Sequence, residues 1–139
     1  MKPLLLDTNV VSAMRAPHRQ PPEFQRWFHR TDPLSCHVSS LTWLEIETGI
    51  LKKRRTDPAQ AQVLAAWFQT IQAEYQRRTI PFSDATAIVT APLMLLPSRG
   101  SIDTLIAGTA LTHGMDLVTR NVADFADIPG LSVVNPWCE

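Results

Sequence analysis

The acidic residues with the clearest potential for chemistry lie in four separate segments of the chain. Asp7 directly follows three leucines, Glu45 and Asp103 lie early in predicted helices, and Asp124 follows a short apolar run. A carboxylate at the end of a buried strand is costly unless a cation, a helix N-terminus or a turn compensates it. Clusters with only oxygen donors suit Mg²⁺ or Mn²⁺. If the fold gathers these carboxylates, they predict metal-assisted hydrolysis of a phosphodiester.

Each acid also has a purely structural interpretation, and the sequence leaves these alternatives open. Asp7 could cap the helix that follows it. Thr42 and Glu45 have the spacing of a capping box, in which Glu45 would bond backbone N–H groups and no metal. Asp103 lies in a first helical turn, where any acid interacts favourably with the helix dipole. Asp124 could bond the amides of its own turn.

The elements that must position these acids alternate between strands and helices. Strands are expected at residues 4–6, 34–40, 116–119 and 131–134, with a strand or turn at 80–82. Helices are expected at residues 8–16, 23–30, 41–54, 57–78, 83–95 (interrupted at Pro92) and 102–114. This alternation predicts an α/β fold, with a mainly parallel central sheet flanked by helices in three layers. Ligands of such sheets bind beyond the carboxyl ends of the strands, where Asp7 is expected.

Length and composition indicate one folded domain over residues 1–139. Apolar residues make up 45% of the chain, and 13 basic residues balance 13 acidic ones. No global charge therefore attracts a nucleic acid or a membrane, so local clusters must do so. Cys36 and Cys138 form neither a disulfide framework nor a zinc spacing. The leucine run is too short for a signal peptide or membrane span, so a soluble cytoplasmic protein is expected.

Three arginines lie in or beside segments that carry a candidate acid, namely Arg15, Arg99 and Arg120. Contacts from such side chains to phosphates supply most nonspecific affinity for nucleic acids. The basic run at residues 52–55 ends a predicted helix, where cations interact favourably with the helix dipole in any case. The three arginines are therefore the candidates for phosphate contacts.

Four segments in order resemble one known family. They are "LLLDTNVVS", "SSLTWLEIETG", "SIDTLIAGTALTHGMDLVTRNVADF" and "IPGLSVVNPW". Together they resemble the PIN-domain ribonucleases, in particular the VapC-type and FitB-like toxins of bacterial toxin–antitoxin pairs. The resemblance runs from the first strand to the C-terminus, so it implies a single PIN-like domain.

The resemblance implies a function and a set of site residues. It implies an endoribonuclease that depends on Mg²⁺ or Mn²⁺, is inhibited by a small antitoxin protein and forms a homodimer. Its catalytic acids fall on Asp7, Glu45 and Asp103, which would hold the metal, with Asn121 or Asp124 completing the shell through water. Thr8 and Asn9 fall on the small polar pair that follows the first aspartate of the family, and with Thr119 they would support the site. The three arginines chosen above for their positions, Arg15, Arg99 and Arg120, would contact RNA.

Two departures from the family pattern keep alternatives open. Asn121 stands where relatives often have a fourth acid, so a binding module without hydrolysis is one alternative. Prolines interrupt residues 91–101, which leaves the local substrate groove and the role of Arg99 open. A phosphatase with an aspartate nucleophile is a weaker alternative, because Asn9 stands where it needs a second aspartate and no lysine follows Lys53.

Overall fold

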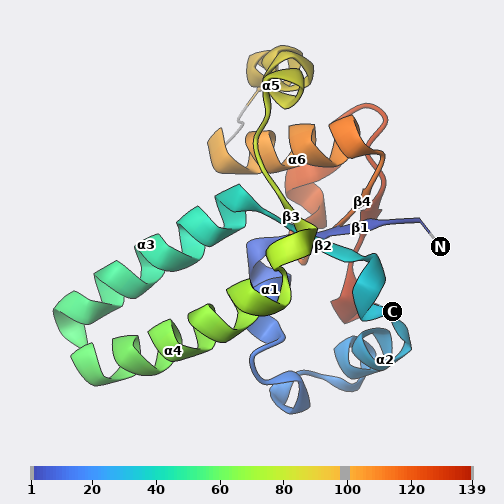
Figure 1. Cartoon of the computed structure of the whole chain (residues 1–139). Coiled ribbons are helices and arrows are strands. Elements are labelled where there is room, and N and C mark those ends of the chain that lie inside the picture. The colour runs from blue at the N-terminus through green and yellow to red at the C-terminus, as the bar shows by residue number, and fades with distance from the viewer. Residues whose placement is uncertain (1, 98–100, 139) are drawn as a thin grey trace.

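A five-stranded parallel sheet forms the centre of the domain (Figure 1). The computed structural model describes residues 2–97 and 101–138. Within them the strand order is β3-β2-β1-β4-β5, and every neighbouring pair is parallel. The strands are β1 (Leu4–Leu6), β2 (Cys36–Ser39), β3 (Thr79–Ile80), β4 (Asp116–Val118) and β5 (Val133–Val134). The predicted α/β class is confirmed. Since β1 is central, Asp7 follows the middle strand of the sheet.

Helices cover both faces of this sheet. They are α1 (Thr8–Ala13), α2 (Pro22–Arg30), α3 (Ser40–Thr56), α4 (Pro58–Glu74), α5 (Asp84–Thr90) and α6 (Ser101–His113). Successive side chains of a strand point to opposite faces, so Leu6 packs with α1 to α4 and Leu5 with α6. Figure 1 shows α3 and α4 side by side as a hairpin that projects from the sheet. No helix in the described ranges has both the length and the apolar character needed to cross a bilayer.

The predicted helix boundaries are largely confirmed by their caps. Ser39 Oγ accepts a hydrogen bond from Leu41 N (3.0 Å), and Asp57 Oδ1 accepts one from Gln60 N (3.1 Å). Ser83 caps α5, which ends at Thr90 and continues as a 3₁₀ turn over Ala91–Leu95, as Pro92 predicts. Gly114 follows α6 with a φ of 64°, a conformation that favours glycine.

The helix predicted over residues 57–78 is wrong at its C-terminal end. The α-helix stops at Glu74, and a 3₁₀ turn over Gln76–Arg78 follows. The reason is the edge strand β3, which begins at Thr79 and must pair with β2. Arg78 Nε donates to Cys36 O (3.0 Å) and fixes this turn against β2. Sheet pairing therefore overrides the helical pattern of the sequence.

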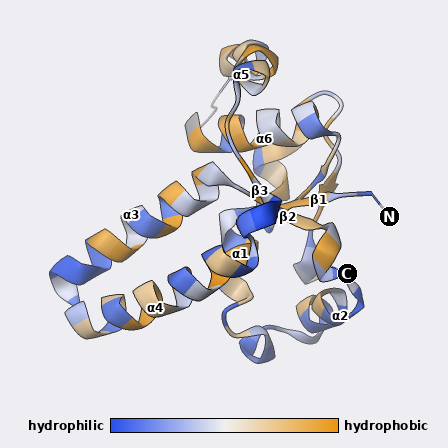
Figure 2. Cartoon of the chain, in the orientation of Figure 1, coloured by the Kyte–Doolittle hydropathy of each residue, from blue (hydrophilic) through white to orange (hydrophobic). Residues whose placement is uncertain are grey.

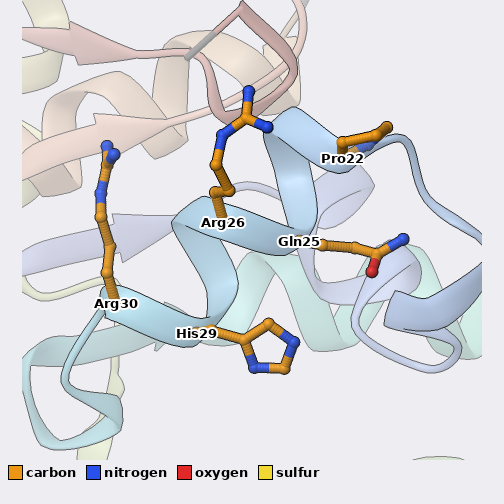
Figure 3. Close-up of a pocket in the computed structure, with 5 residues that line it drawn as sticks. All are labelled: Pro22, Gln25, Arg26, His29 and Arg30. Carbon is orange, nitrogen blue, oxygen red and sulfur yellow. The ribbon is translucent and has the colours of Figure 1, made fainter.

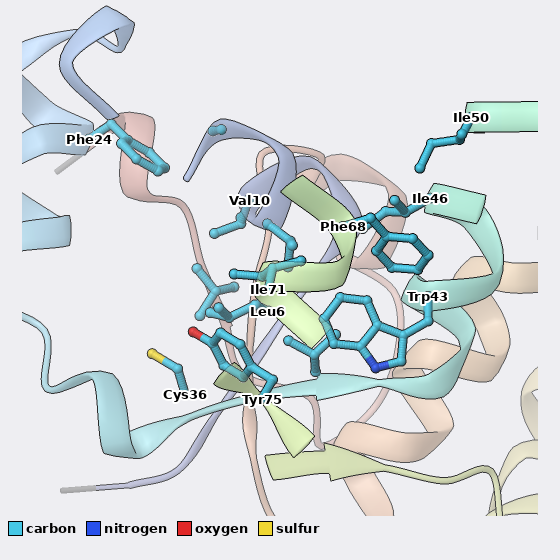
Figure 4. Close-up of a cluster of buried hydrophobic side chains, with 14 of the residues drawn as sticks. Leu6, Val10, Phe24, Cys36, Trp43, Ile46, Ile50, Phe68, Ile71 and Tyr75 are labelled. Atoms are coloured by element: carbon cyan, nitrogen blue, oxygen red, sulfur yellow. The ribbon is translucent and has the colours of Figure 1, made fainter. Parts of the chain in front are cut away.

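An aromatic cluster joins the α3–α4 hairpin to the sheet (Figure 4). Trp43 of α3 and Phe68 of α4 are buried, with ring centroids 5.7 Å apart. Trp43 Nε1 also donates to Thr79 Oγ1 at the start of β3 (3.1 Å). Figure 2 shows hydrophilic residues at the far end of α3, where the basic run 52–55 is exposed. The hairpin is thus anchored at its base and polar at its tip.

The opposite face of the sheet is packed by small residues of α6. Ile106, Ala107 and Ala110 are fully buried. At Gly108, an added Cβ would lie 1.8 Å from Thr90 Oγ1, so only glycine lets α5 approach α6 this closely. This packing fixes α6, whose first turn carries Asp103.

Candidate active site

Asp7 lies at the carboxyl end of β1 and is only 3% exposed. Its Oδ1 accepts a hydrogen bond from Thr8 N, and its Oδ2 accepts one from the Thr119 hydroxyl, both at 2.8 Å. Asp7 is therefore the cap of α1, as one alternative held. The bond from Thr119, which follows β4, shows that the carboxylate also joins two strand ends. Its position is fixed from both sides.

Glu45 reaches the same region from α3. Thr8 Oγ1 donates to Glu45 Oε1 (2.5 Å) and lies 3.3 Å from Thr42 Oγ1. Because Ser39 is the cap of α3, the capping-box interpretation of Thr42 and Glu45 is wrong. Thr42 is fully buried. Thr8 therefore links the two candidate acids, because its backbone N–H donates to Asp7 and its hydroxyl donates to Glu45.

The electrostatics of Asp7 are unfavourable for its charged form. Burial, the largest cause, raises the pKa of Asp7 above its ordinary value of 3.8. The hydrogen bonds from Thr119 and Thr8 lower this pKa, whereas the charges of Glu45 and Asp124 raise it further. A nearby cation would have the opposite effect to these two acids.

Asn9 connects α1 to the end of β4. Its Nδ2 lies 3.3 Å from Thr119 Oγ1 and 3.5 Å from Asp7 Oδ2, and its Oδ1 accepts a hydrogen bond from Arg120 N (3.2 Å). Asn121 N donates to Thr119 Oγ1 (3.1 Å). Asn9 therefore uses an amide donor and an amide acceptor at once, which an aspartate carboxylate at this position could not do.

The other predicted site residues lie in three further segments. Asp103 is half-buried in the first turn of α6, while Asn121 and Asp124 are exposed after β4. Arg99 lies outside the described residues. In the described part of the chain, no three acidic, histidine or cysteine side chains stand together in a way that could hold a metal ion. The metal-ligand roles of Asp7, Glu45, Asp103, Asn121 and Asp124 stay predictions.

The remaining candidate arginines lie at two different places. Arg15 lines a groove of about 430 Å³ that also contains Thr8 and Glu45. The Arg120 guanidinium lies over the Trp137 ring, 5.1 Å from its centroid.

Sequence reasoning missed both Trp137 and the buried Thr42 as neighbours of site residues. Their signal was present only as a C-terminal "NPW" and as a threonine in an apolar helix face.

A second hollow lies away from these residues, along α2 (Figure 3). It measures about 640 Å³ and is lined by Pro22, Gln25, Arg26, His29 and Arg30. None of the predicted catalytic residues lines it. Size alone therefore does not identify the active site, and the carboxylates beside Thr8 remain the better candidate.

The family of this chain follows from its similarity to known proteins. The PIN domain family matches residues 4–131, so the chain belongs to the PIN-domain family. The chain is 57% identical over 136 residues to ribonuclease VapC1 of Rickettsia felis, with 94% of each chain covered. It is also 44% identical over 64 residues to ribonuclease VapC14 of Mycobacterium tuberculosis (strain CDC 1551 / Oshkosh), a match that spans 46% of this chain and 61% of that protein.

Solved structures agree with this family. The crystal structure of FitAcB from Neisseria gonorrhoeae matches with a TM-score of 0.81 and 28% identity, covering 96% of this chain and 98% of that one. A toxin–antitoxin complex from Klebsiella pneumoniae matches with a TM-score of 0.67 and 25% identity, covering 96% and 97%. The resemblance to VapC-type and FitB-like proteins seen in the sequence is confirmed.

Proposed function

We propose that this chain is a divalent-metal-dependent endoribonuclease and the toxin of a toxin–antitoxin pair. The observation that carries the proposal is the buried Asp7 carboxylate, whose neighbours Glu45 and Asp124 make its charge still less favourable. A bound cation would compensate these charges and favour the ionised form of Asp7. The names of the relatives, which are ribonucleases, support hydrolysis of RNA as the reaction.

The chemistry of the donors fits Mg²⁺ or Mn²⁺, because carboxylate and amide oxygens are the ligands these ions prefer. Asp7, Glu45 and Asp103 would hold the ion, with Asn121 or Asp124 completing its shell through water. When bound, the ion would activate water and neutralise charge that develops on the phosphate. Thr8 and Thr119 orient Asp7, and Thr8 also orients Glu45. Arg15 would bind a phosphate of the substrate in the groove beside Glu45.

The proposed partner is a small antitoxin protein. The similarity to chains of FitAcB and of a toxin–antitoxin complex supports this role. A homodimer and a cytoplasmic location are further expectations from the family resemblance. Size-exclusion chromatography with light scattering tests the first, and an open reading frame for a small protein beside this gene tests the partner.

The decisive test is cleavage of a single-stranded RNA of mixed sequence by the purified chain. We expect cleavage with Mg²⁺ or Mn²⁺, none with EDTA, and none by the Asp7→Asn variant, whose fold is checked by circular dichroism. Tight binding of RNA or of a partner without turnover would favour the binding module instead. Turnover of a small phosphomonoester through an aspartyl-phosphate would favour the phosphatase, but Asn9 supplies an amide where that reaction needs a second aspartate.

A further inference from the structure

Gly49 stands in the interior of α3, one turn after Glu45, and is exposed. Glycine is unfavourable in a helix interior relative to alanine, so it needs a reason. At Gly108 the reason is Thr90, which leaves no room for a side chain. At Gly49, by contrast, an added Cβ would meet no atom within 4 Å. The packing of the described chain therefore does not explain this glycine.

Two grooves meet at Gly49. The α3–α4 groove, about 430 Å³, runs between α1, α3 and α4, and the α3–α6 groove, about 370 Å³, runs between α3 and the start of α6. Glu45 and Gly49 are the two residues that line both grooves. Residues four apart lie on the same face of a helix. Because Gly49 has no side chain, no side chain separates the two grooves at this position. The position lies one helical turn from Glu45, a candidate catalytic acid.

Basic side chains line each groove. Arg15 and Lys53 line the α3–α4 groove, and Lys52 lines the α3–α6 groove. Among the described residues, none of these three cations forms an ion pair. The grooves thus offer positive charge on both sides of Gly49. This arrangement fits a single-stranded nucleic acid better than a peptide, because a nucleic acid carries a phosphate at every nucleotide.

We propose that the sugar–phosphate backbone of single-stranded RNA crosses α3 over Gly49, passing from one groove to the other. Arg15 and Lys53 bind phosphates on one side of the crossing and Lys52 binds one on the other. The absent side chain at Gly49 lets the strand approach the helix backbone closely enough to bring a phosphate to Glu45. This path rests on the proposed ribonuclease function and specifies how the substrate lies in that site.

The Gly49→Ala substitution tests the path, since it should affect stability and binding in opposite directions. In the Asp7→Asn background, which should not cleave, we measure binding of a fluorescein-labelled single-stranded RNA by anisotropy. We expect the melting temperature to rise by about 3 °C and the affinity for RNA to fall about tenfold through steric overlap. An unchanged affinity overturns the path. So does a lower melting temperature, because packing within the chain would then explain the glycine.

The charges are tested by the salt dependence of the same binding. Each of Lys52→Gln and Lys53→Gln should reduce the slope of log K against log salt by about one. The matched controls are Arg54→Gln and Arg55→Gln, because these residues are exposed on the same helix but line neither groove. Equal reductions in all four variants would place the RNA on the hairpin tip and overturn the path.

A cleavage assay in the otherwise unaltered chain separates this inference from the proposed function. If the unaltered chain cleaves RNA and Gly49→Ala cleaves it equally well at subsaturating RNA, the path is wrong and the function stands. The reverse result is also informative. If the unaltered chain never cleaves RNA with Mg²⁺ or Mn²⁺, but Gly49→Ala, Lys52→Gln and Lys53→Gln change RNA binding as expected above, the function is wrong and the path stands.

Discussion

Asp7 and Glu45 meet at Thr8, but the regions that carry them are built differently. Asp7 sits at the carboxyl edge of the sheet, 3% exposed, with hydrogen bonds to both oxygens from residues after β1 and β4. Glu45 is half-buried on α3, a 17-residue helix of which the far end projects from the sheet. Parallel strand pairing fixes the first acid, whereas the packing at the base of a hairpin fixes the second.

The difference separates a rigid part of the site from an adjustable one. Leu6 pairs with Val38 on one side and Val118 on the other, so Asp7 cannot move without disturbing three strands. Glu45 depends on how Trp43 and Phe68 seat the α3–α4 hairpin. We therefore expect substitutions in the hairpin to alter the position of Glu45 while leaving the surroundings of Asp7 intact.

The largest effect should follow from removing the charge that the hairpin brings to the site. Glu45→Gln keeps the size of the side chain but loses a metal-binding carboxylate, so RNA cleavage should fall more than about a thousandfold. The matched control is Glu47→Gln on the same helix, which is exposed and lines neither groove, and should change cleavage less than about twofold. Similar losses in both variants would mean that the overall charge of α3 matters, and not metal binding by Glu45.

The next effect concerns the base of the hairpin. Phe68→Ala removes a buried ring that packs on Trp43, and should lower the free energy of unfolding by about 3 kcal/mol. Leu51→Ala, on the exposed side of α3, should cost less than about 1 kcal/mol. Urea unfolding measures both. A small cost for Phe68→Ala would show that the hairpin does not depend on this aromatic contact.

Much of the sheet edge could be predicted from the sequence, because strand ends and caps depend on local patterns. Three leucines followed by an acid indicated β1 and Asp7. A short polar side chain also stands directly before each of α3, α4 and α5, and Ser39, Asp57 and Ser83 cap these helices in the structure. These signals are local: a cap requires only a short polar side chain before a helical pattern. The parallel order of the sheet followed from the alternation of strands and helices.

What the sequence could not reveal depends on contacts between distant segments. The hydroxyl of Thr42 meets that of Thr8 across 34 residues. The local sequence shows only the capping-box spacing of Thr42 and Glu45, which does not reveal this contact. Arg120 meets the ring of Trp137 only because the C-terminal turn packs on α2. The end of α4 was misplaced for the same reason, since pairing of β3 with β2 terminates the helix.

Thr8 joins the two regions, so its substitution should have an intermediate effect. Thr8→Val keeps the shape of the side chain but cannot donate to Glu45 Oε1, and we expect cleavage to fall about tenfold. Thr8→Ser retains the hydroxyl and should recover most of the activity. The affinity for Mn²⁺, measured by calorimetry, should fall in parallel for the valine variant. Full activity of Thr8→Val would show that Glu45 needs no such link to the sheet edge.

The smallest effect is on the stability of the metal-free protein and concerns Asp7 alone. Burial, with the charges of Glu45 and Asp124, raises the pKa of Asp7 above 3.8 in the folded chain. The folded chain therefore holds a proton at Asp7 more tightly than the unfolded chain does. Consequently the contribution of Asp7 to the free energy of unfolding decreases as the pH rises from about 3.8 through the raised pKa.

In EDTA at pH 7 the Asp7→Asn variant should accordingly melt higher than the unaltered chain, by about 3 °C. The difference should vanish below pH 3.8, where Asp7 is protonated in both states. Added Mn²⁺ should raise the melting temperature of the unaltered chain more than that of the variant, because binding to the folded state stabilises it. A variant that melts lower at pH 7 would mean that the hydrogen bonds from Thr8 and Thr119 outweigh the cost of burying the charge. The sheet edge would then be stable without a cation, and its difference from the hairpin would be one of rigidity alone.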